Sequence, residues 1–148
     1  MNNILNYLLT DWADTLFIMV LFGVLGLGLE VIFTAILDAK KDHQRHLWGY
    51  SSLWYLPLYM MAPIVLELSA DMISPLPFLA RGLIYMIAIF SCEFVAMYAL
   101  RKLLGASPSE ANYKLSRWNI CGLIRLDYAP AMFLMGLIFE FVYQQIGW

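Results

Sequence analysis

Four long apolar stretches fill most of this 148-residue chain, and they constrain its fold more than any other feature. A stretch of about 20 apolar residues can cross a bilayer as a helix, because a helix satisfies its own backbone hydrogen bonds. We expect four such spans, at 13–37, 47–70, 78–104 and 131–145. Only 14% of the residues are charged, against about 25% in soluble domains. The sequence therefore predicts a single all-α integral membrane domain with four transmembrane helices.

Prolines and polar residues subdivide the chain. Pro57 and Pro63 interrupt the second span and predict a kinked or partly broken helix whose freed carbonyls need other partners. Residues 1–12 place Leu and Ile at helical spacing among polar residues, which indicates a short amphipathic segment at the membrane interface. Residues 118–130 are too polar and too short to span, so they predict an interfacial or re-entrant segment before the last helix.

The distribution of Lys and Arg predicts the orientation. Residues 38–46 contain three of these basic residues, and residues 101–125 contain five. The N-terminal segment and the C-terminus contain none, and residues 71–81 contain one. The positive-inside rule then places both basic loops in the cytoplasm and both termini outside. We expect an integral protein of a bacterial inner or plasma membrane.

Each span carries one glutamate, namely Glu30, Glu67, Glu93 or Glu140. A charged side chain at the centre of a bilayer costs about 2.5–3.5 kcal/mol on insertion scales, so such residues face a bundle interior. Glu30 and Glu93 each lie eight residues before the basic end of their spans, and Glu140 lies ten residues after Pro130. At about 1.5 Å per residue, all three lie about 12–15 Å from the cytoplasmic ends of their helices.

This spacing predicts one acidic site shared by Glu30, Glu93 and Glu140. Three carboxyls in a dry site cannot all be ionised, so at least one carries a proton. Such a site suits cation binding, proton transfer, or a purely structural hydrogen-bond network. Glu30 shares a helix face with Gly23, Gly26 and Thr34. Glu93 shares one with Tyr85, Ile89 and Ala96, and Glu140 shares one with Phe133, Gly136, Tyr143 and Gln144. Faces of this kind suit contacts between helices.

Other candidate residues lie nearer the ends of the spans. Glu67 and Arg81 fall near one level at the outer boundary, which predicts a structural ion pair. Asp127 and Tyr128 lie on the interfacial segment, where they could meet a solute or a lipid head group.

Several other chemistries are not indicated. His43 and His46 lie in a basic loop and favour a solvated segment over a metal site. The chain has no nucleotide-binding glycine loop, CxxC pair or Ser/His/Asp order. Its net charge of −2 does not suggest a nucleic-acid partner. We therefore expect no metal and no cofactor, and the sequence assigns no catalytic residue.

The order of short motifs from Gly26 to Glu140 resembles the transmembrane protein 229 family of animals and the related bacterial CmpB-like family, labelled ABC-transporter permeases. The residues that carry the resemblance are Glu30-Val-Ile-Phe-Thr34, Ser52-Leu-Trp54, Glu67, Arg81-Gly-Leu-Ile-Tyr85, Glu93-Phe94, Pro108, Gly122-Leu-Ile124, Leu126-Asp-Tyr-Ala129 and Glu140. The chain departs from the family pattern at Pro108-Ser-Glu-Ala-Asn-Tyr113, which lacks a tryptophan. The resemblance implies a small multi-span membrane protein, without a nucleotide-binding domain of its own.

Three functions remain open at this stage. The acidic site favours a transporter or permease-like component, in which a broken second helix exposes carbonyls to a cavity. An intramembrane enzyme that modifies lipid and a non-catalytic subunit of a larger complex are the alternatives, and a non-enzymatic role is favoured. Four short spans make a small pathway, so besides the lipid bilayer we expect a homo-oligomer or a partner membrane subunit.

Overall fold

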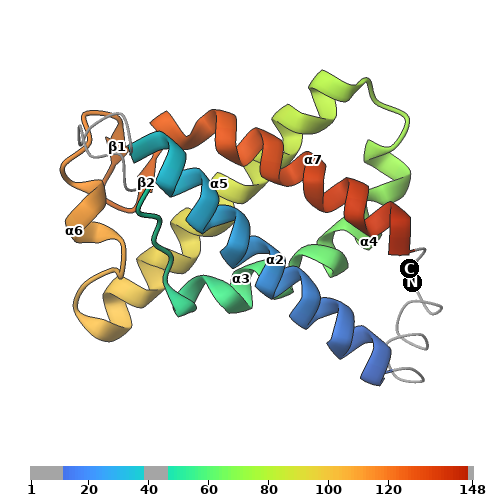
Figure 1. The fold of residues 1–148 in the computed structure, drawn as a ribbon, viewed down its shortest axis with the longest axis horizontal. Coiled ribbons are helices and arrows are strands. Elements are labelled where there is room, and N and C mark those ends of the chain that lie inside the picture. Colours follow the sequence, from blue (N-terminus) through green and yellow to red (C-terminus); the bar gives the residue numbers. More distant parts are fainter. Residues whose placement is uncertain (1–11, 39–46, 147–148) are drawn as a thin grey trace.

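The computed structural model describes residues 12–38 and 47–146, which form the helical bundle of Figure 1. Its helices are α2 (Trp12–Asp38), α3 (Leu56–Met60), α4 (Ala62–Ile73), α5 (Phe78–Leu104), α6 (Glu110–Tyr113) and α7 (Ala129–Ile146). The remaining elements are two 3₁₀ turns, η1 (Leu53–Tyr55) and η2 (Leu126–Tyr128), and two strands, β1 (Asn119–Ile120) and β2 (Ile124–Arg125). Four helical segments are long and apolar enough to cross a membrane, at 12–37, 53–73, 78–104 and 126–146. The predicted fold class is confirmed.

The first and third spans agree with the sequence-based bounds, because α2 and α5 begin and end within one residue of them. The last span is longer than predicted, since α7 begins at Ala129. The α2 start and the α7 end lie at one end of the molecule, and α6, β1 and β2 lie at the other (Figure 1). We call the latter the basic end, because Arg101 and Arg117 lie there. The predicted interfacial segment 1–12 lies outside the described residues, except for Trp12.

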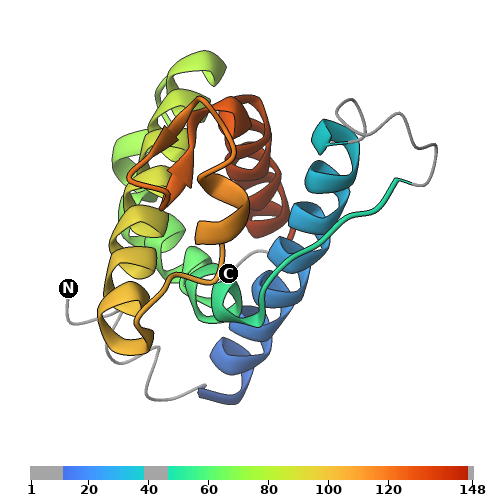
Figure 2. The same ribbon diagram turned by 90° about the vertical axis from the view of Figure 1, so that its left-hand side faces the viewer.

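The second span begins later than predicted, because residues 47–52 are not helical and lie along the last turns of α2 (Figure 2). Thr34 accepts the Tyr50 N–H at 3.0 Å, and its hydroxyl lies 3.0 Å from the Tyr50 carbonyl oxygen. Gly49 passes so close to α2 that a Cβ there would lie 2.0 Å from the Val31 carbonyl oxygen. Thr34 and Gly49 together allow a non-helical backbone in this position, where hydropathy alone predicted helix.

The predicted break in the second span is confirmed. Pro57 lies in the first turn of α3, Pro63 lies in the first turn of α4, and Met61 separates the two helices. A proline in the first turn removes no helical hydrogen bond, because the first N–H groups of a helix have no partner there. The sequence has therefore placed each proline at the start of a new helix.

The predicted interfacial or re-entrant segment 118–130 folds as a small hairpin followed by η2 and the start of α7. Cys121 and Gly122 both have positive φ, and the Leu123 N–H donates to the Ile120 carbonyl at 2.9 Å. Because Ile120 pairs with Ile124, this tight turn belongs to a three-residue hairpin loop of Cys121, Gly122 and Leu123. Leu123 and Ile124 are buried, and β2 contacts α5. The segment therefore packs into the protein beside the last turns of α5.

The packing of this hairpin changes where α7 begins. Gly136 lies against Tyr85 of α5, with an added Cβ only 2.3 Å from the Tyr85 Cβ. Because Gly136 is seven residues into α7 and the two helices run in opposite directions, α7 begins about opposite Cys92. That level is twelve residues before α5 ends at Leu104. The space beside the last turns of α5 is filled by the hairpin and α6 instead.

Candidate functional site

Glu93 lies near the middle of α5 and is only 2% exposed. Its Oε1 accepts hydrogen bonds from the Tyr55 hydroxyl at 3.0 Å and the Tyr113 hydroxyl at 2.9 Å. Its Oε2 is also buried, and no described residue donates to it. Three separate elements, η1, α5 and α6, thus converge on one carboxyl group.

Glu30 of α2 is held in a similar way by hydroxyl groups. Its Oε2 accepts from Ser51 at 2.7 Å and from Tyr59 at 2.9 Å. The Tyr59 ring stacks on Tyr55, with 6.2 Å between the ring centroids, so the environments of the two glutamates are adjacent. We call Glu30, Ser51, Tyr55, Tyr59, Glu93 and Tyr113 the central acidic site. Two of the three acids expected to share a site are brought together here.

Glu140 does not join them, which corrects the prediction of a three-carboxyl site. Its Oε1 lies 3.3 Å from the Arg81 guanidinium, near the end of α5 that is opposite the basic end. The reason is that α7 begins opposite Cys92 and not at the basic end, so each of its residues lies nearer the opposite end of α5. With Gly136 beside Tyr85, Glu140 falls opposite Arg81, one helical turn further along. Counting residues from Pro130 assumed that all helices begin at one level.

The expected ion pair between Glu67 and Arg81 is also corrected. Glu67 instead accepts a hydrogen bond from the Tyr143 hydroxyl of α7, because Arg81 is occupied by Glu140. We call Glu67, Arg81, Glu140 and Tyr143 the Arg81 cluster. A cavity of about 220 Å³ lies beside it, lined by Glu140, Tyr143, Tyr85, Gln144, Ser74, Leu66 and Ala70. This cluster holds two carboxyls and one guanidinium.

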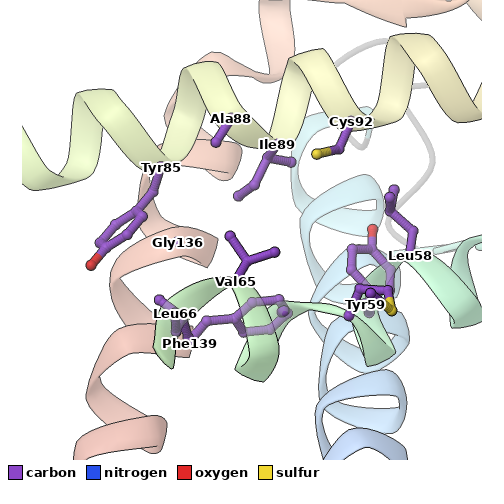
Figure 3. Close-up of a pocket in the computed structure, with 12 residues that line it drawn as sticks. Leu58, Tyr59, Val65, Leu66, Tyr85, Ala88, Ile89, Cys92, Gly136 and Phe139 are labelled. Atoms are coloured by element: carbon purple, nitrogen blue, oxygen red, sulfur yellow. The ribbon is translucent and has the colours of Figure 1, made fainter. Parts of the chain in front are cut away.

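An apolar pocket of about 110 Å³ lies between the two polar groups of residues. Figure 3 shows Tyr59 at one end of this pocket and Tyr85 at the other, with Ile89, Leu66 and Phe139 around the space between them. Tyr59 belongs to the central acidic site, and Tyr85 lines the cavity of the Arg81 cluster. The pocket therefore separates two polar regions by a layer of hydrocarbon side chains.

Asp127 and Tyr128, predicted as binding residues, surround Arg125 near the basic end. Arg125 is 3% exposed and donates to Asp127 through Nε at 3.1 Å and Nη2 at 2.5 Å. Its Nη1 donates to the Tyr128 hydroxyl at 2.7 Å, and the guanidinium lies 4.0 Å from the centroid of the Tyr128 ring. A bidentate pair of this kind is strongly directional, so it fixes the start of α7 relative to the hairpin.

Glu110 anchors α6 from the exposed side. Its carboxylate contacts Lys114 at 2.5 Å, the Ser107 N–H at 3.1 Å and Arg101 at 3.0 Å. The Lys114 ammonium, the Ser107 N–H and Arg101 together lower the pKa of the Glu110 carboxyl from 4.5 to about 2. Burial, and then the neighbouring Glu93 carboxyl, raises the pKa of the Tyr113 hydroxyl, which therefore remains a hydrogen-bond donor.

The sequence interpretation missed the tyrosines that hold the carboxyls. Tyr55 and Tyr59 are four residues apart, which places them on one face of a helix, and this spacing was an available signal. Tyr113 gave no such signal, because it reaches Glu93 from a helix of only four residues in a polar loop. The Arg81–Glu140 pair could not be predicted either, because that prediction requires knowing the register between α5 and α7.

Among residues 12–38 and 47–146, no three His, Cys, Asp or Glu side chains gather as they would around a metal ion. No family model matches the chain, and no solved structure matches it significantly. The description of the candidate site therefore rests on the structure alone. The site consists of the central acidic site, the apolar pocket and the Arg81 cluster.

Proposed function

We propose that this protein is a permease-like transport component that binds a proton or a small cation at the central acidic site. Glu30 and Glu93 are the binding carboxyls, and Tyr55, Tyr59 and Tyr113 position them. Glu140 and Tyr143 belong to a second station in the Arg81 cluster. We also propose that the chain belongs to the permease-labelled family that its motifs resemble.

The observation that carries the proposal is the environment of Glu93. Its side chain is buried, it receives hydrogen bonds only from hydroxyl groups, and one of its oxygens has no donor among the described residues. Burying an ionised carboxylate without a cation is costly, so this group is stable when it holds a proton or a cation. A group that must take up positive charge to be stable in a membrane suits proton or cation transfer.

The arrangement along the bundle supports transport over simple packing. The central acidic site and the Arg81 cluster lie at different levels, and the apolar pocket of Figure 3 lies between them. Passage between the two stations requires this layer to open. The break at Met61, between α3 and α4, provides a joint beside the same pocket. A homodimer or a partner subunit would complete so small a pathway.

An enzyme that modifies lipid is the weaker alternative. In that alternative Asp127 meets the lipid head group, and Glu93 or Glu140 acts as the acid or base. Asp127 already accepts two hydrogen bonds from Arg125 and a third from Ser116, which occupy its oxygens. Glu140 is paired with Arg81, so its carboxylate is a poor general base.

The test is ion flux in proteoliposomes that contain the purified full-length protein. Vesicles with an internal pH dye, or with a dye for sodium or potassium, report the flux that an imposed gradient drives. We expect wild-type protein to pass protons or one of these cations above the level of empty vesicles. Glu93→Gln, which keeps the shape and removes the charge, is expected to abolish that flux.

Asp71→Asn is the matched control, because it also removes one carboxylate but lies exposed near the end of α4. We expect its flux to equal that of wild type. Flux that is unchanged by Glu93→Gln would exclude the central acidic site as the route. Wild-type vesicles that behave like empty ones towards all three ions would exclude the proposed transport.

A further inference from the structure

A cavity of about 440 Å³ opens at the basic end of the molecule, apart from the central acidic site. Its lining comes from two places, residues 112–127 and Tyr50 of the non-helical segment beside α2. The volume falls within the range of about 300–1,000 Å³ that small-molecule sites occupy. This cavity is therefore large enough to hold a phosphate group together with part of the molecule that carries it.

The lining of this cavity is positively charged. Arg117 and Arg125 contribute two guanidinium groups, and Asp127 contributes one carboxylate. Asp127 accepts hydrogen bonds from Arg125 through both of its oxygens, and Arg125 and Asp127 both make further interactions. Arg117 is exposed, and no ion pair to it occurs within the described part of the chain. Its guanidinium is therefore a positively charged group on the cavity lining that suits an anion.

The other lining residues carry groups that donate hydrogen bonds. Asn112 brings a side-chain amide, and Trp118 brings an indole N–H. An arginine with neighbouring N–H donors is the arrangement that proteins use for phosphate oxygens, because a planar guanidinium matches two of those oxygens at once.

The rim of the cavity is strongly apolar, which distinguishes a lipid from a free anion. Leu115 is 85% exposed and Trp118 is 66% exposed, although both line the cavity. Exposed tryptophan and leucine beside basic residues are typical of protein surfaces at the head-group level of a bilayer. In the sequence, Lys114 directly precedes Leu115, and Arg117 directly precedes Trp118.

We propose that this cavity binds the phosphate of an anionic phospholipid head group from the leaflet at the basic end. Arg117 contacts the phosphate, Asn112 and Trp118 donate hydrogen bonds to it, and Leu115 lies against the acyl chains. The Arg125–Asp127 pair forms a wall of the site and stays intact when the lipid binds. This proposal rests on the cavity alone and does not depend on transport.

The location allows a bound lipid to affect the central acidic site through α6. Asn112, which lines the cavity, precedes Tyr113, which donates its hydroxyl to Glu93. Both residues lie on the single turn of α6. A lipid that binds Asn112 therefore holds α6 in the position from which Tyr113 reaches Glu93.

The experiment measures binding to the full-length protein in detergent, with no transport assay involved. Short-chain phosphatidylglycerol, short-chain phosphatidylcholine and inorganic phosphate are titrated separately, and tryptophan fluorescence reports the occupancy. We expect phosphatidylglycerol to bind measurably more tightly than either of the others. Arg117→Gln is expected to weaken that binding about tenfold, as the loss of one charge-assisted hydrogen bond does.

Lys102→Gln is the matched control, because Lys102 is exposed at the same end but does not line the cavity. We expect it to leave the phosphatidylglycerol affinity unchanged. An equal loss in both variants would show that diffuse surface charge attracts the lipid, and it would overturn the proposed site. Equal binding of phosphatidylcholine, or of inorganic phosphate alone, would overturn the assignment of an anionic phospholipid.

Discussion

At the scale of single residues, glycines decide how closely the helices approach the tyrosines. A Cβ at Gly26 would lie 2.3 Å from the Tyr59 ring, so only glycine allows that ring to pack flat against α2. The same ring carries the hydroxyl that donates to Glu30. The position of the Glu30 carboxyl therefore depends on a missing side chain one helical turn away.

Gly26→Ala tests this dependence directly. The added methyl group must push the Tyr59 ring away, and overpacking of this kind costs about 1–3 kcal/mol. We expect a lower thermal unfolding temperature in detergent. The control is Gly28→Ala on the same helix, where an added Cβ meets no atom within 4 Å. Alanine there is expected to leave the stability equal or slightly higher, and an equal loss in both variants would contradict the role of the Tyr59 contact.

At the scale of helices and loops, hydropathy predicted the spans but not the ends that depend on packing. α2 and α5 follow directly from their apolar lengths, and the two prolines predicted the division of the second span. Hydropathy predicted residues 47–52 as helix, but they are not helical and lie against α2, where the Thr34 hydroxyl accepts the Tyr50 N–H and Gly49 allows a close approach. Glu30 and Glu93 do lie in adjacent environments, as predicted, because both acids are on long uninterrupted helices. Glu140 was misplaced, because the level of α7 is set by a hairpin that no periodicity reveals.

The loop that carries α6 is expected to depend on pH through Glu110. The pKa of its carboxyl is about 2 in the folded protein, against 4.5 without its partners. A lowered pKa stabilises the loop above about pH 4.5, and that contribution is lost as the pH falls from about 4.5 to about 2. We expect the protection of amides in residues 106–118, measured by hydrogen exchange relative to the intrinsic rate at each pH, to fall over this interval in wild type.

Glu110→Gln serves as the comparison, since it removes the titrating group and its pairing with Lys114 and Arg101. The variant is expected to exchange faster than wild type at neutral pH. The difference between the two proteins should disappear towards pH 2. A difference that stays constant across this interval would show that Glu110 does not anchor the loop.

At the scale of the whole molecule, α5 and α7 cross (Figure 1). The ion pair between Arg81 and Glu140 joins these two helices. Arg81 and Glu140 are expected to be energetically coupled, because removal of either one leaves a partly buried charge without its partner. A double-mutant cycle of Arg81→Gln and Glu140→Gln should give a coupling energy of about 1–3 kcal/mol in detergent unfolding.

The matched cycle pairs Arg81→Gln with Glu67→Gln. Glu67 is bound by Tyr143 and not by Arg81, so we expect a coupling energy below about 0.5 kcal/mol. The reverse order of the two coupling energies would restore the ion pair predicted from the sequence. It would also require a different register between α5 and α7.

The position at which α7 begins, about opposite Cys92, has a consequence for how the protein is made. The last helix can reach its final depth only when the hairpin beneath it has formed, because Arg125 joins the two through Asp127 and Tyr128. The ribosome delivers that hairpin just before α7 itself. The order of synthesis thus favours a hairpin that folds before the final hydrophobic helix takes up its position in the membrane.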